Sequence, residues 1–124
     1  MYPNEKLTGL IIEAAIEVHR NLGPGLMESV YETCLCYELT LRDLQFERQK
    51  ELSLVYKGIC LDSTCRHDVI VDGKVIIELK SVDQLHPIHE AQVLTYLKLS
   101  GVKTGLLINF NSRLLKDGIR RFVL

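Results

Sequence analysis

The spacing of apolar residues over the first forty positions predicts two helices. Apolar side chains recur every three or four residues from Leu7 to Leu22, with charged residues between them, which is typical of an amphipathic helix. Asn4 stands where a side-chain N-cap is expected, and Gly23-Pro24-Gly25 cannot continue a helix. A second apolar stripe predicts another helix from about Met27 to Arg42.

Beyond residue 50 the pattern changes to the alternation that is typical of strands. A strand is predicted over 52–56, followed by a turn at Lys57-Gly58 and by one long or two short strands between Ile59 and Val71. Asp72-Gly73 is a strong β-hairpin signal, and Lys74–Val82 is the returning strand.

The last forty residues predict a third helix and two further strands. Pro87 suits the first turn of a helix that runs to Ser100, and Gly101 ends it. Thr104–Phe110 is predicted to be a buried strand and Ile119–Leu124 an edge strand. This order of elements predicts an α/β fold, a mixed sheet flanked by helices, in a single domain over residues 1–124.

Composition and charge exclude some classes of function but do not identify one. The net charge is −1, from 15 Lys and Arg against 16 Asp and Glu, so no global field favours nucleic acid or membrane. No apolar run approaches the ~20 residues that cross a bilayer, and no secretory leader is recognisable, which predicts a cytoplasmic protein without membrane contact. The four cysteines are then expected to be free thiols, although zinc binding together with His86 or His89 is an alternative.

The predicted hairpin carries the most informative polar residues. Glu78 and Lys80 lie two apart in an apolar strand, so their side chains leave the same face of the sheet. One interpretation is a solvated face with a cross-strand ion pair. The other is a site for a hard cation such as Mg²⁺, with Asp68 and Glu78 as oxygen ligands and Lys80 acting on a water or a phosphate.

Hairpin register provides a test of the second interpretation. A two-residue turn at Asp72-Gly73 would place Asp68 and Glu78 on opposite faces of the sheet. A three-residue loop over 71–73, with Gly73 left-handed, would pair Ile70 with Lys74 and make the two carboxylates diagonal neighbours on one face. The metal site therefore requires the bulged loop.

Three other groups of polar residues have an ordinary and a functional interpretation. Glu28, in a first helical turn, suits the helix dipole but also offers a third carboxylate. A polar stripe on the third predicted helix is either exposed to solvent or able to position a water or phosphate; it contains His89, Gln92 and Tyr96. A C-terminal basic cluster is either a solvated strand end or a phosphate contact; it contains Arg113, Lys116, Arg120 and Arg121.

Taken together, these motifs resemble a known family. From about Leu7 to Leu124 the chain is similar to the GxxExxY proteins of the PD-(D/E)XK nuclease superfamily. The motifs that carry the resemblance are Gly25-x-x-Glu28-x-x-Tyr31, Arg66-x-Asp68, Glu78-Leu79-Lys80, Pro87-Ile88-His89-Glu90-Ala91-Gln92, Thr95-Tyr96-Leu97 and Gly105-Leu106-Leu107-Ile108-Asn109-Phe110. The resemblance implies a restriction-endonuclease-like core of helix, antiparallel strands, helix and strand.

The resemblance also implies a function. Asp68 and Glu78 would bind Mg²⁺ or Mn²⁺, Glu28 would act as a third carboxylate, and Lys80 would activate or steady the attacking water. Gln92 and Tyr96 would support the site. The predicted protein is a metal-dependent nuclease that hydrolyses phosphodiester bonds of nucleic acid, DNA in the first instance, with a homodimer or a partner protein helping to hold the substrate. The alternative is a non-catalytic module that keeps the fold and binds nucleic acid or protein.

Overall fold

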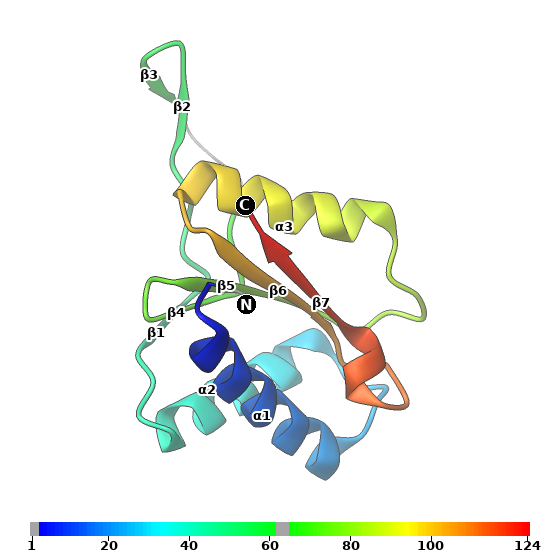
Figure 1. Cartoon of the computed structure of the whole chain (residues 1–124). Helices are drawn as coiled ribbons and strands as arrows, with labels where there is room; N and C mark the ends of the chain where they lie inside the picture. The colour runs from blue at the N-terminus through cyan, green and yellow to red at the C-terminus, as the bar shows by residue number, and fades with distance from the viewer. Residues whose placement is uncertain (1–2, 62–64) are drawn as a thin grey trace.

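Two helices, a run of strands, a third helix and two final strands follow one another along the chain (Figure 1). The computed structural model describes residues 3–61 and 65–124. Its elements are α1 (Glu5–Leu22), α2 (Glu28–Leu41), β1 (Phe46–Arg48), β2 (Leu54–Tyr56), β3 (Ile59–Leu61), β4 (Val69–Val71), β5 (Val75–Lys80), α3 (Pro87–Ser100), β6 (Thr104–Asn109), the 3₁₀ turn η1 (Leu115–Gly118) and β7 (Ile119–Val123).

Five of the strands form one mixed sheet in the order β1-β4-β5-β6-β7. Strands β5 and β6 are parallel, and the other neighbouring pairs are antiparallel. The parallel pair is joined by α3, as a parallel connection requires a crossover. Strands β2 and β3 form a separate two-stranded sheet, a hairpin that extends away from the main sheet (Figure 1).

The helices cover both faces of the sheet. Helices α1 and α2 pack on one face, and α3 packs on the other (Figure 1). Strand β5 alternates accordingly: Ile77 and Leu79 belong to the core beneath α1 and α2, whereas Ile76 packs with Val93 and Leu97 of α3. Glu78 therefore faces the α3 side of the sheet, in the row that begins with Ile76.

Most of the predicted elements are confirmed, including both long helices, the third helix, the buried strand and the final edge strand. The region Ile59–Val71 forms two short strands, β3 and β4, and its residues 62–64 lie outside the described residues. The strand expected from residue 52 begins at Leu54. The edge strand β1 was not predicted at all, because a strand of three residues, none of them fully buried, carries no periodic signal.

The predicted N-cap is wrong. Asn4 has a φ of 59°, and its side chain makes no capping hydrogen bond to α1. Its amide instead donates to Thr104 Oγ1 at 3.3 Å, which ties the start of α1 to β6. A tertiary contact has replaced the local one.

The β4–β5 hairpin has the parity that the metal site requires but a different loop. Gly73 is left-handed, as predicted, with a φ of 64°. The three-residue loop is Asp72-Gly73-Lys74, however, and it pairs Val71 with Val75. The predicted pairing of Ile70 with Lys74 is wrong because it would remove the fully buried Val71 from the sheet and insert a lysine. The observed register, continued by one step, places Asp68 directly opposite Glu78.

Candidate active site

Two carboxyl groups meet on the α3 side of the sheet. Asp68 precedes β4, and Glu78 opposes it on β5. The Asp68 carboxylate is fixed by the backbone of β5, because its Oδ2 accepts a hydrogen bond from Leu79 N at 2.7 Å. The hairpin thus brings together the two acids that sequence reasoning assigned to a metal.

The environment of Glu78 strongly disfavours its charged form. The side chain is only 3% exposed. Burial raises the pKa of Glu78 to about 9, with further contributions from the hydrogen bond to Asp68 and from the negative charge of Asp68. The positive charge of Lys80 and a hydrogen bond from Tyr96 offset only part of this shift. The interpretation as a solvated face with an exposed ion pair is therefore wrong for Glu78.

Helix α3 contributes two polar side chains, Tyr96 and Gln92, on the face of the sheet that carries Asp68 and Glu78. The Tyr96 hydroxyl is hydrogen-bonded to Glu78, and the pKa of Tyr96 is raised first by burial and then by the Glu78 charge. One turn earlier, Gln92 Oε1 is buried and has no hydrogen-bond partner within the described residues. The interpretation of this stripe as exposed to solvent is wrong for both groups, because α3 turns them toward the sheet.

Glu28 and Lys80 lie at the open end of the site. The pKa of His89 is lowered by desolvation, then by the positive charges of Lys80 and His86, while Glu28 acts in the opposite direction. His89 thus lies within electrostatic reach of both Lys80 and Glu28. The charged and polar groups that shift the pKa of Glu78 most are Asp68, Lys80 and Tyr96, and Glu28 is not one of them.

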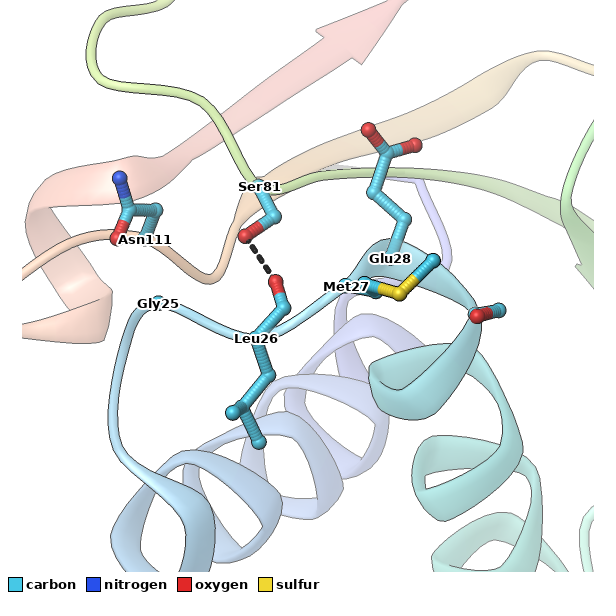
Figure 2. Close-up of a pocket in the computed structure, with 7 residues that line it drawn as sticks. Gly25, Leu26, Met27, Glu28, Ser81 and Asn111 are labelled. Carbon is cyan, nitrogen blue, oxygen red and sulfur yellow. Dashed lines mark hydrogen bonds between the residues drawn. The ribbon is translucent and has the colours of Figure 1, made fainter.

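A shallow hollow of about 530 Å³ extends from Glu28 along the end of the sheet. Figure 2 shows Glu28 projecting from the first turn of α2 and Ser81, the residue after Lys80, bonded through its hydroxyl to Leu26 O at 2.5 Å. The lining residues are Gly25, Leu26, Met27, Glu28, Ser29, Ser81 and Asn111. Asp68 and Glu78 are not among these residues; Ser81, directly after Lys80, connects the hollow to the strand that carries Glu78.

The loop before α2 explains the Gly25-x-x-Glu28-x-x-Tyr31 motif. Gly25 has a φ of 94°, which favours glycine. The Tyr31 hydroxyl donates to Gly23 O at 2.6 Å and accepts from Leu26 N at 3.1 Å, so it closes the loop from inside. The Tyr31 ring stacks on Phe110 at 4.5 Å between centroids. Tyr31 therefore fixes the loop that presents Glu28.

Sequence reasoning missed a second set of polar residues behind Asp68. Glu32 of α2 is buried, 7% exposed, and forms an ion pair with Arg48 at 2.9 Å. The Gln49 amide nitrogen donates to Glu32 Oε1 at 2.8 Å and to Asp68 Oδ1 at 3.3 Å. The unpredicted strand β1 delivers Arg48 and Gln49 to this place, so no signal in the sequence pattern identified them.

The predicted C-terminal basic cluster is divided by the fold. Arg121 donates to Thr8 Oγ1, and Arg120 donates to backbone oxygens of Asp117 and Ile119. Arg113 and Lys116 instead line a hollow of about 300 Å³ between α1 and η1, together with Ile16, His19, Arg20, Leu114 and Leu115. His19 Nε2 is bonded to Ser112 O at 2.7 Å, which fixes the connecting loop.

A divalent cation at this site would need oxygen ligands from the side chains around Asp68 and Glu78. No group of three or more His, Cys, Asp or Glu side chains suited to a metal occurs in residues 3–61 and 65–124. A site for Mg²⁺ needs only one or two carboxylates, since water and phosphate oxygens complete its shell. The two crowded carboxyl groups of Asp68 and Glu78 fit this requirement.

A family model describing the PD-(D/E)XK nuclease superfamily matches residues 5–122. The chain belongs to that superfamily. The match spans every helix and nearly all of the sheet, and it indicates a nuclease-type function for this fold. No curated protein and no solved structure matches the chain significantly. No helix in the described part of the chain is long and apolar enough to cross a bilayer.

Proposed function

We propose that the protein is a divalent-metal-dependent nuclease that acts as one domain over residues 1–124 and hydrolyses phosphodiester bonds of DNA. The observation that carries this proposal is the buried position of Glu78 against Asp68: burial raises the pKa of Glu78 to about 9, and the hydrogen bond to Asp68 and its negative charge act in the same direction. Asp68 and Glu78 would both be held in their charged forms by a divalent cation, because its two positive charges oppose the burial and the repulsion that favour the proton. The superfamily membership supports the same conclusion.

Each residue of the site has a defined task in this proposal. Asp68 and Glu78 hold Mg²⁺ or Mn²⁺, which when bound withdraws charge from the phosphate and makes water a stronger nucleophile at neutral pH. Lys80 orients the attacking water and stabilises negative charge on the phosphate. Tyr96 donates to Glu78 and keeps its carboxylate in place, and the free Oε1 of Gln92 accepts from a water.

Attack of the water on phosphorus breaks the bond to O3′ and leaves a 3′-hydroxyl and a 5′-phosphate. Glu28 lies at the edge of this reaction and contributes a third carboxylate, directly or through water. Because Glu28 projects from α2 beside the hollow in Figure 2, the substrate strand passes along that hollow.

Two cations that line the hollow between α1 and η1 support a polyanionic partner. Arg113 lies in the loop after Asn111 and Lys116 lies in η1, and neither forms an ion pair with the residues that the structure describes. Replacing both with alanine is expected to reduce the slope of log affinity against log salt by about 2 for duplex DNA. Arg120→Ala is the matched control, since that guanidinium binds backbone oxygens and should leave the slope unchanged.

A second function is favoured by one specific feature. With its pKa near 9, Glu78 carries a proton at neutral pH and bonds to Asp68 without any metal. Such a pair can serve as a purely structural contact in a module that binds nucleic acid or protein. The small, nearly neutral chain is also consistent with a homodimer or a protein partner in the cytoplasm.

A metal-binding measurement separates the two functions. Mn²⁺ should bind the wild-type protein and should be lost in Asp68→Asn, which preserves the shape of the side chain. Asp72→Asn, in the exposed turn of the same hairpin, is the control and should bind like wild type. A panel of single- and double-stranded DNA and RNA with Mg²⁺ and Mn²⁺ then identifies the substrate. Equal Mn²⁺ binding by all three proteins would favour the non-catalytic module.

A further inference from the structure

Gln49 occupies an unusual place at the edge of the sheet. The register of β1 with β4 pairs Arg48 with Val69, so its continuation pairs Gln49 with Asp68. Gln49 N donates to Asp68 O at 2.9 Å, which supports this pairing. Gln49, Asp68 and Glu78 therefore stand in one row across three neighbouring strands.

The side chain of Gln49 connects two acids from different layers. Its amide nitrogen has two hydrogens, and its two acceptors are Glu32 Oε1 and Asp68 Oδ1. Glu32 is itself held by Arg48, with Nε donating at 3.0 Å and the terminal nitrogen at 2.9 Å. The amide is thus anchored on the α2 side by a fixed carboxylate and reaches the site on the other side.

The hydrogen bond from Gln49 to Glu32 is shorter than the one from Gln49 to Asp68. The bond to Glu32 is 2.8 Å and the bond to Asp68 is 3.3 Å, just beyond the common range. One long hydrogen bond from Gln49 restricts rotation of the Asp68 carboxylate, and Oδ1 can still accept further hydrogen bonds or bind a cation. Asp68 Oδ2 is already fixed by Leu79 N at 2.7 Å, so both oxygens have a defined direction.

The backbone of Gln49 provides an independent observation. Its φ of 51° is left-handed, a conformation that costs free energy for any residue with a Cβ and that is rare outside Asn, Asp and Gly. Strained positions of this kind cluster at functional sites. Here the left-handed turn ends β1 and brings the amide to the edge between Glu32 and Asp68.

We infer that Gln49 is a positioning residue, which holds the Asp68 carboxylate in the direction needed for a divalent cation and links it to the Arg48–Glu32 pair of the helical layer. This inference rests on the proposed metal site. Groups that orient a metal ligand change affinity by 10–100-fold when removed. Gln49 would therefore affect the cation without touching it.

The variant that tests this is Gln49→Met, which keeps the length of the side chain and the left-handed strain but removes the donor. We expect Mn²⁺ affinity, measured by titration calorimetry, to fall 10–100-fold. Gln49→Gly, which removes the strain as well, should show the same loss. Asp43→Gly is the matched control: Asp43 is also left-handed, with a φ of 57°, but it lies after α2 and should leave Mn²⁺ affinity unchanged.

A metal-free readout accompanies the titration. Without Gln49 the Asp68 carboxylate is less restricted, so amide hydrogen exchange at Leu79 should accelerate several-fold in Gln49→Met, while exchange at Ile77 stays as in wild type. If wild type binds Mn²⁺ and Gln49→Met binds it within threefold, with unchanged exchange at Leu79, the positioning role is wrong. If wild type binds no Mn²⁺, the proposed metal site itself is wrong, and accelerated exchange in Gln49→Met still supports the contact with Asp68.

Discussion

Raising the pH should strengthen metal binding in a way that depends on one side chain. Since the pKa of Glu78 is about 9 without metal, the carboxyl group carries a proton at pH 7. Removing that proton at pH 7 costs about 3 kcal/mol, at 1.36 kcal/mol for each pH unit below the pKa. A cation that binds both carboxylates must displace it.

The expected result is a linked release of one proton. Mn²⁺ affinity should rise close to tenfold per pH unit from about pH 6 to pH 8 and level off near pH 9. Because Asp68 and Glu78 interact, the released proton belongs to the pair. Calorimetry in two buffers of different ionisation enthalpy counts this proton directly.

Glu78→Gln is the decisive variant, because an amide imitates the protonated acid and cannot ionise. It should bind Mn²⁺ weakly and without a pH dependence in this range. Glu90→Gln removes an exposed carboxylate from α3 and should behave like wild type. A wild-type affinity that stays flat from pH 6 to pH 8, or a slope that survives in Glu78→Gln, would refute the reasoning.

The same group affects stability in the metal-free protein. The folded-state pKa of Glu78 lies above its ordinary value of 4.5, so the folded protein holds the proton over a range in which the unfolded chain has lost it. The stabilisation is fully present below pH 4.5 and decreases as the pH rises toward 9. Between pH 4.5 and pH 7 the loss is about 3 kcal/mol, and urea unfolding of wild type against Glu78→Gln measures it.

Other predictions concern catalysis and packing. Lys80→Met should keep Mn²⁺ affinity within a few-fold but reduce cleavage by ~10²–10⁴-fold in a single-turnover assay, because it removes a group that acts on the reacting centre. Tyr31→Phe, which breaks two hydrogen bonds in the loop before α2, should lower the free energy of unfolding by about 1–2 kcal/mol. Tyr37→Phe, at a tyrosine that is 63% exposed, should change it by less than about 0.5 kcal/mol. Gly105→Ala should destabilise by about 1–3 kcal/mol, since its Cβ would meet a valine methyl carbon at 2.8 Å. Gly9→Ala, in the middle of α1 with open space around it, should instead stabilise by up to about 1 kcal/mol in thermal or urea unfolding.

The fold could be predicted from the sequence where an element has a strong period or a strong stop signal. Helix α1 has both, in its apolar stripe and in Gly23-Pro24-Gly25, and α3 has Pro87 at its start and Gly101 at its end. Short edge elements lack such signals. Strand β1 has three residues, and its position depends on pairing with β4, which no local pattern records.

Sequence reasoning reached the candidate site through the parity of the hairpin and through the family resemblance. Residues two apart in one strand share a face, so Glu78 and Lys80 could be placed together, and the hairpin register then decided the face of Asp68. The loop position was misjudged by one residue because it depends on burial of Val71, a tertiary effect. Gln49 could not be found, because its contact with Asp68 comes from a register between distant strands and from a left-handed backbone.

The central claim is that water attacks phosphorus at the Asp68–Glu78 site with a divalent cation bound. Hydrolysis of DNA in ¹⁸O-labelled water, followed by mass spectrometry of the new ends, tests it most directly. The wild-type protein with Mn²⁺ should produce 5′-phosphate ends that carry ¹⁸O, and Asp68→Asn should produce none. Failure of the wild-type protein to cleave any nucleic acid tried, or equal labelling by Asp68→Asn, would contradict the assignment.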